Sequence, residues 1–424
     1  MRALLLGSGG RESALAWGLA GSNLIDEIVA APGNPGIGEV SDLVDIDPND
    51  PGEVVELAMR ISPHLVVIGP EAPLVAGVGD ALRARGIDVF GPDAGAARIE
   101  GSKSYAKELM DRARIPTAAW QAFSTPDDAV VYMDELGPPY VVKADGLAAG
   151  KGVVVTEERR EAIVAIEQCI VERRFGDAGR TVVIEEYLDG EEASLIAFAD
   201  GQNVLVCEPA QDYKRAFDRD RGPNTGGMGS YSPVPSCPPS LAEQIAEEIL
   251  RPMVAATAAS GTPFVGALYA GLALTTRGAR VVEFNCRFGD PEAQALIPRL
   301  ASDLGEVCLA SARGELEGIK LDWSPDACVC IVLASDGYPG GYETGRMIDG
   351  VDEAAAIDGV EIFHAGTEGS DGSLVTAGGR VLAVSARGAD FKQARARGYR
   401  AAETISFEGM HFRRDIARRA EERE

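Results

Sequence analysis

The first hundred residues alternate short apolar runs with helical stretches, and this pattern restricts the fold more than any other feature of the sequence. Four runs that each end at a glycine or proline are expected to be strands: residues 2–6, 27–31, 65–68 and 88–90. Between them, Asp50 can cap a helix that begins at Pro51 and runs to Arg60. Because strands that alternate with helices form βαβ units, we predict an α/β fold in which residues 1–100 build a Rossmann-like domain around a parallel sheet.

The next part of the chain is predicted to form two units. Residues 101–113 are expected to be a helix that ends before Pro116, and residues 101–120 are grouped with residues 191–325 in a central domain. Long strands follow one another in that domain (193–199, 264–275 and 279–285) beside one helix at 241–260, which favours an antiparallel-rich, α+β arrangement. Residues 121–190 are predicted to be a small α/β unit with a glycine-rich loop between strands.

Residues 326–424 are predicted to form a separate, small C-terminal α/β domain. After Pro325 the strand pattern restarts at 328–334, 360–364 and 380–385, and a helix is expected at 390–404. The last stretch, 413–424, mixes both signs of charge and is expected to be a solvated helix.

Charge and composition argue against several classes of protein. The net charge of −26 disfavours general nucleic-acid binding, which needs clustered lysine and arginine. No apolar run approaches the length of a membrane span, and Gly7 ends the short apolar start too early for a secretory signal, so we expect a cytoplasmic protein without a membrane partner. The seven scattered cysteines favour reduced thiols, and Cys328 and Cys330 are expected to pack in a buried strand rather than to bind metal.

Two glycine-rich loops follow strands. The loop 7–12 opens a helix, so its amides could hold a phosphate, but a merely tight turn is an equal alternative because Glu12 stands where a dinucleotide fingerprint needs glycine. The loop 143–153 carries Lys143 and Lys151 among small residues, which suits a triphosphate. It is not a Walker A loop, because Gly152 stands where serine or threonine would ligate magnesium; a hairpin with incidental lysines is the alternative.

Two later segments carry polar side chains at strand ends. The apolar run 182–184 turns into an acidic cluster whose backbone could pair with a base edge, although such clusters are usually only solvated. In the run 281–292, Glu283, Asn285 and Arg287 alternate and should face one side of a strand. Two oxygen ligands beside a cation suit a magnesium ion that bridges phosphates, and a surface ion pair is the alternative. The stretches 211–215 and 224–229 look more like a substrate loop than a linker.

Taken together, these segments resemble the ATP-grasp superfamily and, along the whole chain, its phosphoribosylamine-glycine ligase family. The resemblance rests on Gly-Gly-Arg-Glu at 9–12, Gly-Pro-Glu-Ala-Pro-Leu at 69–74, the loop 143–152, Pro-Asn-Thr-Gly-Gly-Met-Gly at 223–229 and the run 283–292. It implies an ATP-grasp fold whose lid is the unit 121–190. Family members often carry histidine where Ser13 and Tyr213 stand here, next to expected substrate contacts.

The resemblance also implies a reaction and a set of site residues. Glycine would be joined to phosphoribosylamine through glycyl phosphate, with ATP and Mg²⁺ or Mn²⁺, in purine biosynthesis. ATP would be held by Lys103, Lys143, Gly150, Lys151, Glu185, Glu186, Leu188 and Glu191, and the metal by Glu283 and Asn285. The catalytic residues would be Lys143, Asp212, Lys214 and Arg287. The substrates would be bound by Gly9, Gly10, Arg11, Glu12, Pro70, Glu71, Asp212, Lys214, Asn224, Gly226, Arg287 and Asp290.

Three other functions stay open at this stage. A different ATP-grasp ligase, one that carboxylates or formylates a purine precursor, would need neither glycine nor phosphoribosylamine. An NAD-dependent dehydrogenase is disfavoured by Glu12 and by the lack of an acidic residue after the second strand, and NADH binding would revive it. A non-catalytic nucleotide-binding regulator would bind ATP without forming ADP. The chain is expected to be a monomer or a weak homodimer.

Overall fold

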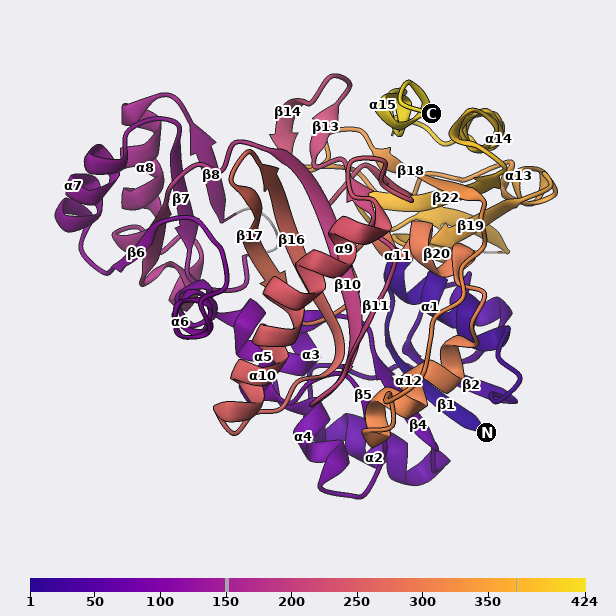
Figure 1. Ribbon diagram of the computed structural model, residues 1–424. Helices are drawn as coiled ribbons and strands as arrows, with labels where there is room; N and C mark the ends of the chain where they lie inside the picture. The colour runs from indigo at the N-terminus through magenta and orange to yellow at the C-terminus, as the bar shows by residue number, and fades with distance from the viewer. Residues whose placement is uncertain (149–151, 371) are drawn as a thin grey trace.

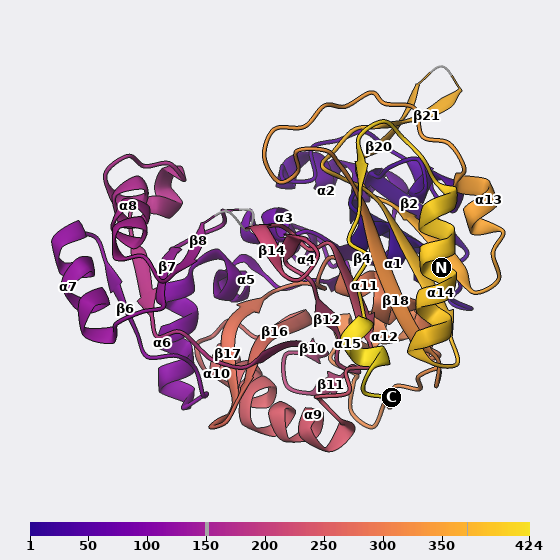
Figure 2. The ribbon, with the colours of Figure 1, turned by 90° about the horizontal axis from the view of Figure 1, so that it is seen from above.

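The computed structural model describes residues 1–148, 152–370 and 372–424. Figure 1 shows the chain gathered around four larger sheets, with the lid unit at one side and the N- and C-terminal parts at the other. Seen from above, in Figure 2, the lid stands apart from the C-terminal part, with the central strands β10, β16 and β17 between them. Within the described residues, no helix is both long enough and apolar enough to cross a membrane.

The N-terminal sheet is parallel, as predicted, with strand order β3-β2-β1-β4-β5. The central strand β1 is buried from Ala3 to Gly7 because helices cover both of its faces. The elements are β1 (Arg2–Gly7), α1 (Gly10–Ala20), β2 (Glu27–Pro32), η1 (Ile37–Glu39), β3 (Asp42–Leu43), α2 (Pro51–Ile61), β4 (Leu65–Ile68), α3 (Glu71–Val75), α4 (Val78–Arg83) and β5 (Val89–Phe90). Asp50 caps α2, as expected, by accepting from the amides of Gly52 and Glu53.

The lid is a four-stranded antiparallel sheet, ordered β6-β9-β7-β8, with two helices on one face. Its elements are β6 (Trp120–Phe123), α7 (Pro126–Leu136), β7 (Tyr140–Ala144), β8 (Val153–Thr156), α8 (Arg159–Ile170), η2 (Gly176–Gly179) and β9 (Val182–Glu185). The glycine-rich loop joins the neighbouring strands β7 and β8, where Lys143 pairs with Val153. The strands β7 and β8 that flank the loop therefore form a hairpin, and Lys143 lies in β7.

The central sheet is antiparallel, as predicted, with order β11-β10-β16-β17. Its strands are β10 (Glu191–Asp200), β11 (Val204–Val206), β16 (Val265–Thr275) and β17 (Gly278–Asn285), and helices α5 (Ala94–Gly101), α6 (Lys103–Ala113), α11 (Glu292–Leu296), η4 (Ile297–Arg299) and α12 (Leu304–Arg313) lie around it. The single helix expected at 241–260 is α9 (Pro239–Ile245), a π-helical turn η3 (Ala246–Leu250) and α10 (Arg251–Ala259). Pro252 has no N–H to donate to a preceding carbonyl, and the wider turn lies directly before it.

The C-terminal sheet extends beyond residues 326–424. Its order is β12-β15-β18-β22-β19, with β23 also paired to β18, so two of its strands come from residues 211–232. The elements are β12 (Gln211–Asp212), β15 (Gly229–Ser232), β18 (Ala327–Ser335), α13 (Val351–Ala355), β19 (Val360–His364), β22 (Arg380–Gly388), α14 (Phe391–Thr404), β23 (Met410–His411) and α15 (Arg418–Glu421). Two hairpins, β13 (Arg215–Phe217) with β14 (Arg221–Asn224) and β20 (Thr367–Ser370) with β21 (Ser373–Thr376), flank it. Cys328 and Cys330 are fully buried in β18.

The prediction of a solvated tail is wrong for the buried residues Arg413, Ile416, Ala417 and Ala420, whereas most of the others between 413 and 424 are exposed. The Arg413 side chain is 0% exposed, donates to the carbonyl of Arg215 at 3.0 Å and pairs with Asp220 on the β13–β14 hairpin. Its guanidinium lies 4.6 Å from the ring centroid of Tyr213, whose hydroxyl accepts from the amide of Ala417. Charge composition could not reveal these partners because they lie almost 200 residues earlier in the chain.

Candidate active site

A cavity of about 600 Å³ is lined by residues of the N-terminal part, the lid, the central sheet and the C-terminal part. Most of the predicted site residues line it: Arg11, Glu71, Lys103, Lys143, Glu185, Glu186, Leu188, Asp212, Lys214, Asn224, Gly226, Glu283, Asn285, Arg287 and Asp290. Lys143 of the lid and Glu283 of the central sheet, 140 positions apart in the numbering, therefore share one cavity. Its lining is strongly charged, with several lysines and arginines facing several carboxylates.

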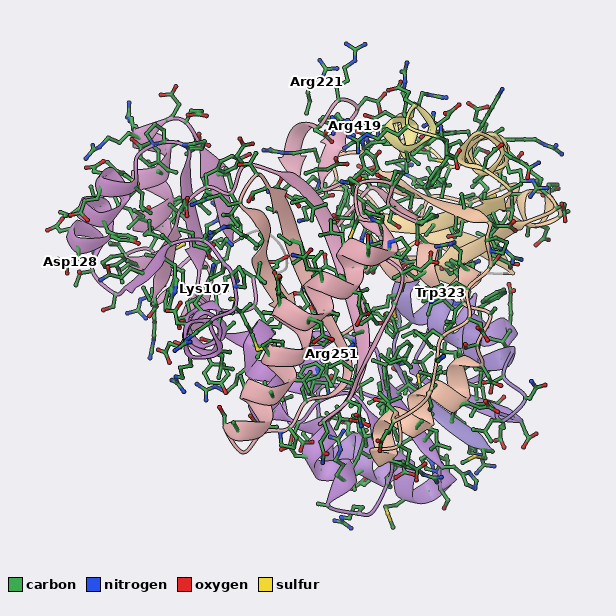
Figure 3. The ribbon with its side chains drawn as sticks, viewed as in Figure 1. Lys107, Asp128, Arg221, Arg251, Trp323 and Arg419 are labelled. Carbon is green, nitrogen blue, oxygen red and sulfur yellow. The ribbon has the colours of Figure 1, made fainter. Side chains whose placement is uncertain are left out.

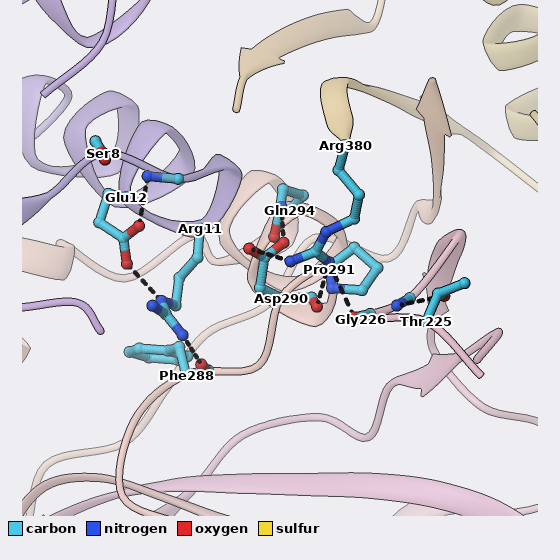
Figure 4. Close-up of polar contacts among 12 residues, drawn as sticks. Ser8, Arg11, Glu12, Thr225, Gly226, Phe288, Asp290, Pro291, Gln294 and Arg380 are labelled. Carbon is cyan, nitrogen blue, oxygen red and sulfur yellow. Dashed lines mark hydrogen bonds and ion pairs between the residues drawn. The ribbon is translucent and has the colours of Figure 1, made fainter. Parts of the chain in front are cut away.

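Five predicted site residues do not line the cavity: Gly9, Gly10, Glu12, Pro70 and Glu191. The amide of Gly9 donates to the carboxylate of Glu12 at 2.8 Å (Figure 4), which agrees with the tight-turn alternative for this loop. A Cβ on Gly10 would lie 2.6 Å from Nε2 of Gln294, which shows how closely α1 packs on α11. Gly150 and Lys151 lie outside the described residues.

The two neighbouring glutamates at the start of β10 face different partners. The carboxylate of Glu191 accepts from Nη1 of Arg423 at 2.9 and 3.0 Å, whereas Glu192 lines the cavity and pairs with Lys214. Successive side chains of a strand point to opposite faces, so only one of the pair can face the cavity. The structure brings Glu192 to the cavity and leaves Glu191 on the other face.

A buried cluster of two lysines and one carboxylate forms the lid side of the cavity. Oε2 of Glu185 accepts from Nζ of Lys143 and from Nζ of Lys107, each at 3.0 Å, and all three side chains are at most 5% exposed. Burial alone would raise the pKa of Glu185, but the ammonium groups of Lys143 and Lys107 outweigh it and hold that pKa below its usual range. Oε1 of Glu185 is buried and, within the described chain, has no hydrogen-bond partner. A free carboxylate oxygen at a cavity wall suits a ligand N–H donor.

Glu283 and Asn285 lie on β17, facing the same cavity. Among the described residues, neither side chain makes a hydrogen bond or an ion pair, so their oxygens are available to a ligand. Burial would raise the pKa of Glu283, but Lys214, Lys143, Lys103 and Arg287 together hold it below its usual range. An ionised carboxylate with a neighbouring amide oxygen is a donor set that fits a hard divalent cation.

Arg287 follows β17 and is held by two carboxylates. Its Nη2 donates to Oε1 of Glu100 at 2.8 Å, and its Nε donates to Oε2 of Glu71 at 3.3 Å. Glu100 also accepts from the amide of Cys286 at 2.8 Å, so it fixes both the backbone and the side chain of this segment. Burial lowers the pKa of a guanidinium, yet Glu100 and Glu71 raise the pKa of Arg287, which keeps its charge.

Asp212 and Lys214 reach the cavity from β12 and the residues after it. Burial raises the pKa of Asp212 to about 7. Glu292 and Glu192 also raise it, whereas Lys214 lowers it. An aspartate with that pKa can exchange a proton near neutral pH.

The C-terminal part of the chain supplies two cavity residues that the sequence analysis missed: Arg380 in β22 and Tyr338 in the turn after β18. Arg380 on β22 donates to the carbonyls of Gly226 and Asp290 at 2.9 and 2.8 Å and to Oδ2 of Asp290 at 3.0 Å (Figure 4). The hydroxyl of Tyr338 accepts from the amide of Gly226 at 3.0 Å. No local sequence signal marks these contacts because they join segments about 90 or more positions apart.

Further charged cavity residues that were missed include Lys107, Glu100 and Glu292. Lys107 could have been predicted from the sequence, because it stands four positions after Lys103 on a predicted helix and therefore lies on the same helix face. Ser13 and Tyr213, which stand where family members often carry histidine, do not line the cavity. Ser13 accepts from the amide of His364, whose imidazole has its pKa lowered to about 4 by burial.

Comparison with known protein families matches nearly the whole chain. Models of the phosphoribosylglycinamide synthetase N domain, ATP-grasp (A) domain and C domain match residues 1–100, 101–293 and 328–419. The phosphoribosylamine–glycine ligase of Agrobacterium fabrum is 48% identical over 424 residues, covering 100% of both chains. That of Streptomyces coelicolor is also 48% identical and covers 99% of both.

Solved structures agree with the predicted fold class. The phosphoribosylamine–glycine ligase of Thermotoga maritima has a TM-score of 0.85 and 34% identity, covering 98% of this chain and 100% of its own. The biotin carboxylase of Campylobacter jejuni has a TM-score of 0.72 at 15% identity, over 97% of this chain and 92% of that one, a likeness of fold alone. The predicted ATP-grasp fold is confirmed.

Proposed function

The chain belongs to the phosphoribosylglycinamide synthetase family, and from this membership and its cavity we propose that it joins glycine to phosphoribosylamine while ATP is cleaved to ADP and phosphate. It is an ATP-grasp ligase of purine biosynthesis. The observation that carries the proposal is the shared cavity of Lys143 and Glu283, which brings cations for phosphate and oxygens for a metal to one place.

In this proposal, ATP binds between the lid and the central sheet. Lys103 and Lys143 contact its phosphates, and Glu185, Glu186 and Leu188 hold adenosine. The free Oε1 of Glu185 supports this assignment because it can accept from an amino group of the base. Glu192 rather than Glu191 is the acidic residue of β10 available to the nucleotide.

Glu283 and Asn285 would hold Mg²⁺ or Mn²⁺. A divalent cation there would neutralise phosphate charge, which is the chemistry it supplies to phosphoryl transfer. Two observations support this choice: within the described residues the side-chain oxygens of Glu283 and Asn285 have no hydrogen-bond partner, and the pKa of Glu283 is held below its usual range.

The reaction is proposed to run in two steps. An oxygen of the glycine carboxylate attacks the γ-phosphorus, the bond to the bridging oxygen breaks, and ADP leaves glycyl phosphate behind. The amine of phosphoribosylamine then attacks the carbonyl carbon, the C–O bond to phosphate breaks, and the nitrogen loses a proton. Arg287 stabilises the transferring phosphoryl group, and Asp212, with a pKa of about 7, is suited to take that proton.

The substrate end of the cavity lies between the N-terminal and C-terminal parts. Arg11 and Glu71 come from the N-terminal part, whereas Asp290 is held by Arg380. We infer that phosphoribosylamine binds here, with glycine between it and the γ-phosphate. The reaction is placed in the cytoplasm, in keeping with seven buried cysteines that form no disulfide.

The test is ADP release measured with glycine and phosphoribosylamine, supplied singly and together. We expect sustained release only with both. Release that needs neither glycine nor phosphoribosylamine would favour another ATP-grasp ligase, and ATP binding without any release would favour a regulator.

A further inference from the structure

Lys107 is buried at the junction of α6 and the lid, where Figure 3 labels it. Its side chain is 2% exposed, although a lysine is rarely buried so completely without a reason. Nζ donates to Oε2 of Glu185 at 3.0 Å and to Oγ1 of Thr117 at 2.8 Å. The Thr117 hydroxyl in turn donates to the carbonyl of Val281 at 2.6 Å, so this chain of hydrogen bonds joins α6 to the lid strand β9 and to β17.

The charges of the cluster give Lys107 a consequence for the nucleotide. Lys107, Lys143 and Glu185 carry two positive charges and one negative charge, a net of +1. Without the charge of Lys107, Glu185 and Lys143 would form a neutral pair. Lys143 would then be held to Glu185 more strongly, and the lid wall would attract a polyphosphate less, because charge effects are strong where water is excluded.

We propose that Lys107 is a positioning residue of the nucleotide site: it shares Glu185 with Lys143, and so keeps the ammonium of Lys143 available to the phosphates and the carboxylate of Glu185 available to the base. The inference rests on the proposed function for the identity of the nucleotide. Lys107 acts through Glu185 and Lys143, and its other hydrogen bond orients it from the opposite strand β17.

Two substitutions separate charge from hydrogen bonding. Lys107→Arg keeps the positive charge, whereas Lys107→Gln keeps a hydrogen-bond donor and removes the charge. Leu109→Ala is the matched control, since Leu109 lies on the same helix, is 1% exposed and does not line the cavity. It reports what destabilisation of α6 does by itself.

The readout is the Kd for ATP, measured by equilibrium dialysis of the full-length protein with Mg²⁺ and without glycine or phosphoribosylamine. We expect Lys107→Gln to raise Kd about tenfold or more, as a loss of about 1.4 kcal/mol requires. Lys107→Arg and Leu109→Ala are expected to stay within about threefold of the unsubstituted protein. In turnover, Lys107→Gln should raise the KM for ATP and leave that for glycine unchanged.

An unchanged Kd in Lys107→Gln would overturn the inference, as would an equal rise in Leu109→Ala or in Lys107→Arg. If Lys107→Gln does not fold, the arginine variant still decides, because a charge role requires it to bind ATP nearly normally. The role of Lys107 and the proposed function can be rejected independently of each other. Binding of ATP does not depend on which substrates are ligated, whereas the absence of glycine-dependent ADP release would reject the proposed function alone.

Discussion

Nη2 of Arg287 donates to Oε1 of Glu100 at 2.8 Å, and the same carboxylate accepts from the amide of Cys286 through its other oxygen. Glu100 lies in α5, at the end of the family's N-domain match, so Arg287, which follows β17, is oriented by an element far from it in the sequence. The geometry of the proposed phosphoryl-transfer site therefore depends on a residue that need not touch the substrates.

We expect Glu100→Gln to lower kcat about tenfold to hundredfold, because a neutral amide holds the guanidinium less firmly and a small displacement of a catalytic group is costly. The Kd for ATP should change little. Steady-state kinetics with dialysis measurements check this, and an equal loss of ATP binding would show that Glu100 supports the whole cavity instead of Arg287.

Lys143→Ala and Arg287→Ala are expected to abolish turnover while the protein stays folded. Each removes a cation proposed to meet phosphate charge in the transition state. Phosphate release and circular dichroism are the measurements. Unchanged phosphate release in either folded variant would reject the role assigned to that residue.

ATP binding should weaken as the pH rises past about 8. Burial lowers the pKa of Lys107 to about 8; Lys143 acts in the same direction, and Glu185 and Asp111 act against it. Above that pH Lys107 loses its proton, and the net charge of its cluster with Glu185 and Lys143 falls from +1 to zero. The Kd for ATP should therefore rise between pH 7 and pH 9, and Lys107→Arg should flatten this rise because arginine stays charged. A rise of the same size in the arginine variant would assign the effect to another group.

Arg413→Ala should lower the free energy of unfolding by about 3 kcal/mol, because it removes a fully buried guanidinium that pairs with Asp220 and donates to the carbonyl of Arg215 on the β13–β14 hairpin. Arg419→Ala is the control. Arg419 also pairs with Asp220, but its side chain is 64% exposed, and Figure 3 shows it at the surface, so its loss should cost less than about 1 kcal/mol. Urea unfolding of both variants distinguishes them, and equal costs would contradict a buried structural role for Arg413.

Arg380→Ala should raise the KM for phosphoribosylamine about tenfold or more and leave the Kd for ATP unchanged. Arg380 holds Asp290 and the backbone of Gly226 together at the end of the cavity away from the lid. Kinetics with each substrate varied in turn measure this. Equal effects on ATP and phosphoribosylamine would mean that the C-terminal sheet shapes the cavity as a whole.

Features set by local pattern could be predicted from the sequence. The alternation of strands and helices predicted the parallel N-terminal sheet, and Glu283 and Asn285, two positions apart in β17, both line the cavity as expected. The choice between Glu191 and Glu192 could not be predicted, because it depends on where β10 begins and one position exchanges the faces.

Contacts between distant segments were also beyond prediction. Glu100, Arg380 and Arg413 each act through partners that chain folding brings together, and their own neighbours in sequence give no sign of it. Gly9 and Gly10 were expected to bind substrate, and phosphate binding by their loop was weighed equally with a tight turn, yet the amide of Gly9 donates to the carboxylate of Glu12. A motif shows which groups are present, whereas only the packed chain shows which of them remain free for a ligand.

The central claim is that glycine is activated as an acyl phosphate in the cavity shared by Lys143 and Glu283. The direct test is turnover with glycine labelled with oxygen-18 in its carboxylate, followed by mass spectrometry of the released phosphate. Transfer of one labelled oxygen to phosphate is the predicted result. Phosphate that forms together with the ligated product but carries no label would contradict the claim.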